Sequence, residues 1–165
     1  MITKEQIAAQ MMKECDIAVH LHSKLDPKSV DYRPSPGQRS TLELLRYLAI
    51  SGIAGTRCMA ESDWKQFSTF SDRVKEMKFE EFPAAMQRQK QEIQSFFNEI
   101  SEKSLETQDA PLPTGGTAKL GEALLGGPFK WITAYKMQLF LYAKATGATE
   151  IGTANAWAGI DGKKP

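Results

Sequence analysis

The segment from Asp31 to Ala49, DYRPSPGQRSTLELLRYLA, constrains the fold of this chain more than any other stretch. Pro34 and Pro36 fix φ and hold the residues before them out of the helical region. Ser40 and Glu43 then have the spacing of a capping box, in which each residue satisfies a backbone N–H of the other. Leucines follow, at Leu42, Leu44, Leu45 and Leu48. The segment therefore predicts an extended stretch that leads into an amphipathic helix over residues 40–60.

Three other long helices are predicted from apolar periodicity and end signals. The first begins at a second capping box, Thr3 with Gln6, and ends before residue 26. The others cover about 83–100, with a proline at the start, and 128–146, with a glycine after the end. Residues 101–127 form a long polar, turn-rich connector with one short helical turn, and no strand pattern is visible. The sequence predicts an all-α bundle.

The C-terminal tail, residues 148–165, follows neither a helical nor a strand period. It nevertheless contains Ile151, Trp157 and Ile160. Because exposing three large apolar side chains is unfavourable, we expect the tail to pack on the bundle. Residues 1–165 are then a single domain.

Composition excludes several classes of protein. Apolar residues make up 41% and charged residues 25% of the chain, which is typical of a soluble globular protein. With 21 basic and 20 acidic side chains, no net charge favours nucleic acid or a membrane surface. The first residues lack a signal pattern, and no apolar run reaches the roughly 20 residues of a spanning helix. Cys15 and Cys58 lie in helical patterns and are expected to be buried, reduced thiols, and a cytoplasmic location is predicted.

Small residues dominate the second half of the helix at 40–60. They are Ala49, Ser51, Gly52, Ala54 and Gly55. Each glycine costs a helix about 1 kcal/mol relative to alanine. Either another backbone approaches this face closely or a cavity lies beside it, and the sequence leaves both explanations open.

Arg33 and Arg39 flank the proline turn. Their guanidinium groups are expected to bind carbonyls or carboxylates of the loop itself. The sequence therefore gives both arginines a structural role and no place in a binding site.

Two stretches carry a resemblance to a known family. Residues 32–49 resemble the start of the second helix of the DinB-like superfamily, and MQLFLYAKATG, residues 137–147, resembles the end of its fourth helix. The resemblance implies a DinB-like four-helix bundle with a long connector between helices three and four. In that family three histidines bind one divalent metal. The matching positions here are Tyr47, Trp131 and Tyr135, so this chain resembles a divergent member that lacks the metal-binding histidines.

These replacements predict the loss of the family's metal. A phenol with a pKa near 10 is a poor ligand at neutral pH, and an indole offers only a donor. His20 and His22 stand two apart on one helix and cannot rebuild the site. We therefore expect no metal, no cofactor and no catalytic residue carried over from the family.

The aromatic positions allow two interpretations. In the first, the aromatic side chains fill the vacated metal site and only pack. In the second, Tyr47, Ser51, Trp131, Tyr135 and His22 line a pocket for a small apolar or aromatic ligand, since such pockets combine apolar walls with a few polar groups. The sequence does not decide between them.

Two functions follow as hypotheses. The favoured one is a non-enzymatic protein that binds a small molecule or another protein. The alternative is a thiol-dependent, transferase-type enzyme that has moved its chemistry to Tyr47, Tyr135, His22 or Cys58, for which a low thiol pKa would be the sign. The helix at 128–146 is apolar nearly all round, with Phe140 and Leu141 outside its inward stripe, so a homodimer is also predicted.

Overall fold

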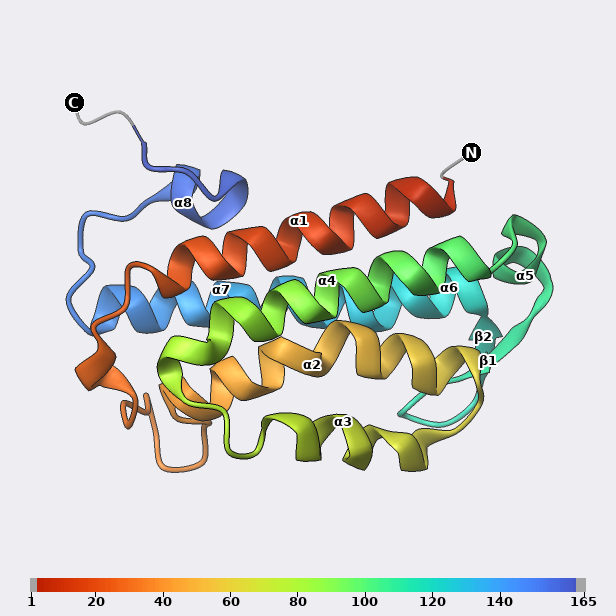
Figure 1. The fold of residues 1–165 in the computed structure, drawn as a ribbon, viewed down its shortest axis with the longest axis horizontal. Helices are drawn as coiled ribbons and strands as arrows, with labels where there is room; N and C mark the ends of the chain where they lie inside the picture. The colour runs from red at the N-terminus through yellow and green to blue at the C-terminus, as the bar shows by residue number, and fades with distance from the viewer. Residues whose placement is uncertain (1–2, 163–165) are drawn as a thin grey trace.

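Four long helices make up the body of the protein in a computed structural model that describes residues 3–162 (Figure 1). They are α1 (Lys4–His22), α2 (Thr41–Ala60), α4 (Phe82–Glu99) and α7 (Lys130–Ala145). Both α1 and α2 pack against α4 and α7, so these two pairs lie on the diagonals of the bundle. Helices α1 and α7 run in one direction, and α2 and α4 run in the other. The predicted all-α bundle is confirmed.

Local signals set the starts of these helices. The Thr3 hydroxyl accepts a hydrogen bond from the Gln6 backbone N–H, and the Gln6 side chain accepts one from the Thr3 N–H. Ser40 and Glu43 make the same reciprocal pair at the start of α2. Both predicted capping boxes are therefore confirmed, and Pro83 lies in the first turn of α4 as expected.

Shorter elements connect the four helices. They are η1 (Pro27–Ser29), η2 (Trp64–Gln66), α3 (Phe67–Val74), η3 (Phe79–Glu81), α5 (Glu102–Thr107), β1 (Asp109–Pro111), β2 (Thr117–Lys119), α6 (Leu120–Leu124), η4 (Leu125–Phe129) and α8 (Thr153–Ala158).

Helix α3 lies along the outer side of α2, where the sequence predicted only a connector (Figure 1). Phe70 and Val74, four residues apart, are buried against the bundle. Eight residues are too few for periodicity to distinguish a helix from a loop, because an isolated helix of that length is marginal without tertiary contacts.

The long connector contains a small hairpin, which corrects the expectation that no strand is present. Strand β1 pairs antiparallel with β2, with Ala110 opposite Ala118. Strands of three residues are too short to display a period of two.

The fourth helical segment also starts earlier than predicted. Helix α6 continues through η4, a π-helical turn that contains Pro128, into α7. The proline that was expected to begin this helix lies instead inside the turn. Gly147 has φ of +125° directly after the end of α7, which agrees with its predicted role as a helix stop.

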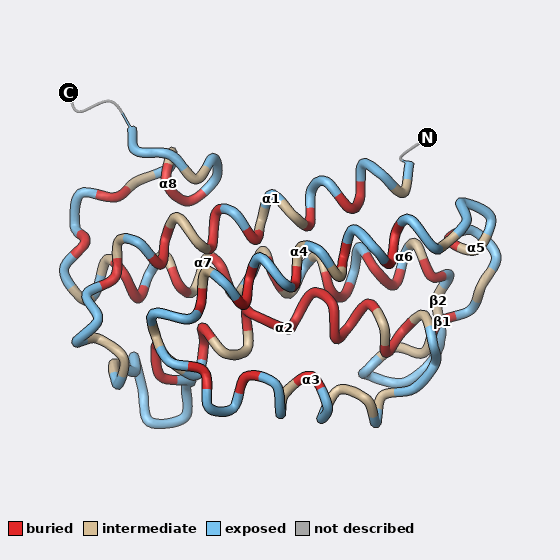
Figure 2. The backbone as a smooth tube through the Cα atoms, in the orientation of Figure 1, coloured by how far each residue is buried: buried red, intermediate tan, exposed pale blue. Residues whose placement is uncertain are grey.

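The core runs between the four helices, and α2 is its most buried member (Figure 2). One polar side chain of α4 reaches into it: Gln89 is 1% exposed. Its Nε2 donates to the Leu48 carbonyl at 2.9 Å, and its Oε1 accepts from the N–H groups of Gly52 at 2.9 Å and Ile53 at 3.2 Å. The side chain of one helix is thus bonded to the middle of the backbone of another.

The tail packs on the bundle through α8, which contacts α1 and α7. Lys136 of α7 is fully buried there. Its Nζ lies 2.9 Å from Oε2 of Glu14 and donates to the Ala156 carbonyl at 2.8 Å. Ile151 is buried as expected, but Trp157 and Ile160 are more than half exposed, so the expected burial of these two side chains is wrong. The ion pair joins α7 to α1, and the hydrogen bond from the same Lys136 Nζ to Ala156 holds the tail on them, in addition to apolar contact.

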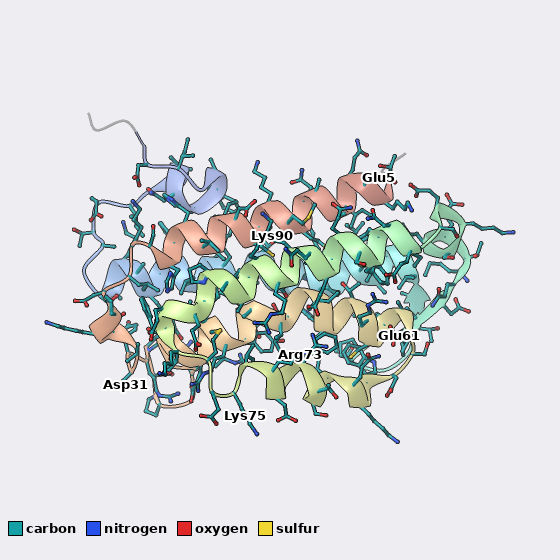
Figure 3. The ribbon with its side chains drawn as sticks, viewed as in Figure 1. Glu5, Asp31, Glu61, Arg73, Lys75 and Lys90 are labelled. Carbon is teal, nitrogen blue, oxygen red and sulfur yellow. The ribbon has the colours of Figure 1, made fainter. Side chains whose placement is uncertain are left out.

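Charged side chains of both signs are distributed around the outside of the bundle. The six that Figure 3 labels come from α1, α3, α4 and the connecting segments, and they are spread over the length of the molecule in that view. None of the helices within residues 3–162 has the length and apolar character needed to cross a bilayer. The predicted cytoplasmic location stays a prediction.

Candidate functional site

The loop before α2 is fixed by hydrogen bonds on both sides of Arg39. The Arg33 guanidinium binds both carboxylate oxygens of Glu43, at 2.7 and 2.9 Å, and also donates to the Gln38 carbonyl at 2.7 Å. On the other side, the Tyr142 hydroxyl of α7 donates to the Arg39 carbonyl at 2.8 Å. Arg33 therefore serves the loop as expected, and the backbone of Arg39 is bound to α7.

The Arg39 side chain does not bind the loop, contrary to the expectation from the sequence. Its guanidinium carbon lies 4.1 Å from the centre of the Tyr47 ring and 5.3 Å from that of Tyr135. Those two rings meet edge to face, with their centres 4.7 Å apart. A guanidinium over an aromatic face is attracted by the ring quadrupole. The result is a cation held by two tyrosines at the junction of α2 and α7.

Trp131 lies one helical turn before Tyr135 on α7 and packs on a later part of α2. Its ring centre is 6.4 Å from that of Trp64, and its indole packs against Gly55 of α2, where an added Cβ would come within 2.5 Å of the ring. At Gly52 an added Cβ would collide with the Ile132 side chain. The two glycines of α2 are thus explained by large side chains of α7 that pack on them, which neither of the two explanations from the sequence had named.

The remaining predicted pocket residues lie in different surroundings. Ser51, one turn after Tyr47 on α2, is fully buried, and its hydroxyl has no hydrogen-bond partner within residues 3–162. His22 lies at the end of α1, stacked on Phe79 and Phe82, and its Nε2–H donates to the Phe79 carbonyl at 2.9 Å. The structure brings Tyr47 and Tyr135 together, whereas His22 contacts Phe79 of η3 and Phe82 at the start of α4. Whether any of these residues binds a ligand stays a prediction.

Burial keeps the reactive groups of this region in their neutral forms. Burial raises the pKa of the Cys58 thiol to about 11, with Asp63 and Glu61 adding to the effect, and the pKa of Cys15 to about 12. Burial also raises the pKa of Tyr47, which the Tyr135 phenol assists and the Arg39 charge opposes. At neutral pH these side chains are therefore thiols and a phenol, and none is an activated nucleophile.

A cavity of about 270 Å³ lies on the other side of Trp131. It is bounded by Met59 at the end of α2, by Leu112 and Thr114 of the hairpin, and by Gly126 in the π-helical turn. Most of its wall is apolar, and Thr114 and Glu122 supply polar groups. Periodicity gives no sign of this cavity, because its walls come from four separate segments of the chain.

No family model matches this sequence, and no curated protein matches it. The crystal structure of a DinB-like protein from Bacillus subtilis superposes on it with a TM-score of 0.70 and 17% sequence identity, over 90% of this chain and 96% of that one. The chain has the DinB-like fold. The fold expected from residues 32–49 and 137–147 is therefore confirmed, even though fewer than one residue in five is identical.

The side chains at the three positions expected to match the family's histidines do not fit a divalent cation. Tyr47 and Tyr135 offer phenols, of which the Tyr47 phenol has a raised pKa, and Trp131 offers no lone pair. The Arg39 guanidinium lies against both tyrosine rings, so a divalent ion beside them would meet a positive charge. No group of three or more histidine, cysteine, aspartate or glutamate side chains suited to a metal is found in residues 3–162.

Sequence reasoning missed Arg39 as a member of this site. It stands next to the helix cap, where a loop role is the ordinary expectation, and nothing in its sequence neighbourhood points to Tyr135, 96 positions later. The only sequence feature that bears on its position is the proline turn, which restricts the backbone of the loop that carries Arg39.

Proposed function

We propose that this protein binds a small apolar or aromatic molecule without a metal, in the cavity beside Trp131. The observation that carries the proposal is the cavity of about 270 Å³ between the hairpin, the end of α2 and the π-helical turn. Ligand sites are typically concave and mostly apolar with a few polar groups, and this cavity has that composition. Its size suits a molecule of one ring or two fused rings.

The wall of the cavity contains features common at binding sites. The π-helical turn Leu125–Phe129 forms one side, and such turns occur frequently at functional sites. Gly126 is exposed within it, and a Cβ added there would meet no atom within 4 Å. Trp131 supplies an aromatic surface.

Binding accounts for these observations better than the thiol-enzyme alternative does. Thiol chemistry requires a thiolate near neutral pH. With a pKa of about 11, Cys58 is protonated there, and its thiol is buried between helices. The charged groups that act on this thiol, Asp63 and Glu61, are acidic and raise its pKa further.

Ligand-observed NMR titration with two neutral probes, indole and p-cresol, tests the proposal. We expect saturable binding of at least one probe and a rise in the thermal midpoint that follows ligand concentration. Gly126→Leu should weaken binding and leave the fold intact, because Gly126 lines the cavity and a Cβ added there meets no atom within 4 Å.

Gly152→Leu is the matched control, since a Cβ at Gly152 also meets no atom and the residue lies before α8, away from the cavity. The proposal is wrong if neither probe binds, or if Gly126→Leu and Gly152→Leu leave the affinity equally unchanged.

We also propose that the protein forms a homodimer through the outer face of α7. Leu141 is 60% exposed there, and Ala134 and Ala145 on the same face are exposed as well. A symmetric partner would bury this apolar strip. We expect Leu141→Glu to convert the dimer to a monomer in sedimentation experiments. Ala158→Glu, on α8, is the control and should leave the dimer intact. A monomeric wild-type protein at micromolar concentration would refute the proposal.

A further inference from the structure

We propose that Arg39, Tyr47 and Tyr135 form a second binding site, which takes the carboxylate of a small aromatic acid. The site lies one helical turn along α7 from Trp131 and does not depend on the cavity described above. Its parts are a positioned cation, two aromatic faces and the hydroxyl groups that these rings carry.

The cation is held in place before any ligand arrives. The Tyr142 hydroxyl binds the Arg39 carbonyl at 2.8 Å, and the Gln138 side chain donates to that same hydroxyl at 2.7 Å. Ser40, the next residue, is fixed as the cap of α2. The guanidinium itself lies over two rings, at 4.1 and 5.3 Å from their centres. Binding an anion here costs less side-chain entropy than binding at a free surface arginine.

The guanidinium has no carboxylate of its own. None of the ion pairs formed within the described part of the chain includes Arg39. An acidic residue close enough to feel its charge is Glu43, whose two oxygens are already bound by Arg33 and by the Ser40 N–H. Those bonds hold the pKa of Glu43 at about 2, so it stays paired with Arg33 at neutral pH. Arg39 is exposed and keeps its N–H groups for another anion.

The surroundings favour a carboxylate attached to a ring. A guanidinium presents parallel N–H groups that match the two oxygens of a carboxylate. The exposed parts of Tyr47 and Tyr135 offer aromatic surface beside it, and burial keeps the Tyr47 phenol protonated, so its hydroxyl is a neutral donor. A neutral ring of the same shape would lose the charge-assisted hydrogen bonds.

Calorimetric or NMR titration of the full-length protein with benzoate and with its neutral amide, benzamide, tests this proposal at low salt. We expect benzoate to bind roughly tenfold more tightly than benzamide, and the ratio to fall as salt is added. Arg39→Met should reduce benzoate affinity about tenfold while the thermal midpoint changes little, because the side chain is exposed.

Arg88→Met, on the exposed face of α4, removes the same charge elsewhere and is the matched control. Equal binding of the two probes overturns the proposal, as does an equal loss in Arg39→Met and Arg88→Met, or no binding of benzoate. Loss of benzoate binding in Gly126→Leu with full binding in Arg39→Met would assign the acid to the cavity instead, and would also overturn it. The indole titration tests the cavity independently of these benzoate experiments, so either proposal can fail while the other stands.

Discussion

Gln89 should be among the most sensitive polar residues of the fold. Its carboxamide bonds to three backbone groups of α2, one carbonyl and two N–H groups, at 2.9 to 3.2 Å. All of them lie in the buried centre of the bundle, where water cannot replace the lost partner. The substitution Gln89→Met keeps the length and volume of the side chain and removes these bonds.

The expected cost follows from that count. Each net hydrogen bond contributes about 1 kcal/mol, so three bonds give a loss of about 3 kcal/mol in the free energy of unfolding for Gln89→Met. Gln89→Ala also leaves a cavity, which adds about 1 to 2 kcal/mol. For a domain of this size a loss of about 3 kcal/mol lowers the thermal midpoint by roughly 6 to 12 °C.

Urea unfolding followed by circular dichroism measures these losses. Gln87→Ala is the control, because Gln87 is exposed on the same helix and should change the free energy of unfolding by less than about 0.5 kcal/mol. The reasoning is refuted if Gln89→Met is as stable as the wild type, since the bonds to α2 would then contribute nothing that apolar packing cannot replace.

Four other outcomes are expected. Iodoacetamide near pH 7 should label Cys58 slowly in the folded protein, because burial raises its pKa to about 11, and rapid labelling would instead support thiol chemistry. Elemental analysis of the purified protein should find no stoichiometric divalent metal; about one metal per chain, lost on chelation, would contradict the aromatic replacement of the histidines. The bonds from Arg33 lower the pKa of Glu43 from 4.5 to about 2. Ionised Glu43 therefore stabilises the fold above about pH 4.5, and this stabilisation is lost as the pH falls toward 2. Compared with the wild type, Glu43→Gln should lower the unfolding midpoint in urea near pH 6 and leave it unchanged near pH 2. Tyr142→Phe should cost about 1 kcal/mol by the same urea assay, because it removes the hydrogen bond to the Arg39 carbonyl, and an unchanged stability would mean that water replaces the hydroxyl.

Features that depend on residues close in sequence were predicted correctly. The two capping boxes and the proline at the start of α4 appear where the sequence placed them, because each involves a hydrogen bond or a dihedral angle within four residues. The extent of α2 was predicted within one residue for the same reason. The resemblance at residues 32–49 and 137–147 correctly predicted the DinB-like arrangement of the helices.

Features that depend on distant residues were missed or left open. The sequence could not tell that α3 is a helix, that residues 109–111 and 117–119 pair, or that the glycines of α2 accommodate Trp131 and Ile132. Each of these is decided by packing between segments tens of residues apart, and periodicity carries no information on which segment will be the neighbour.

The same distinction between local and distant residues applies to the candidate site. The sequence alone determined that residues 47, 131 and 135 are two tyrosines and a tryptophan, and residue identity decides which lone pairs exist there; that they stand where the family has histidines is a prediction from the resemblance. Only the tertiary structure decided that Tyr47 and Tyr135 meet, that Arg39 lies over both rings and that Trp131 borders a cavity. A cation–π contact acts over a few ångströms in space, and residues 39 and 135 come within that range only after α2 and α7 have packed.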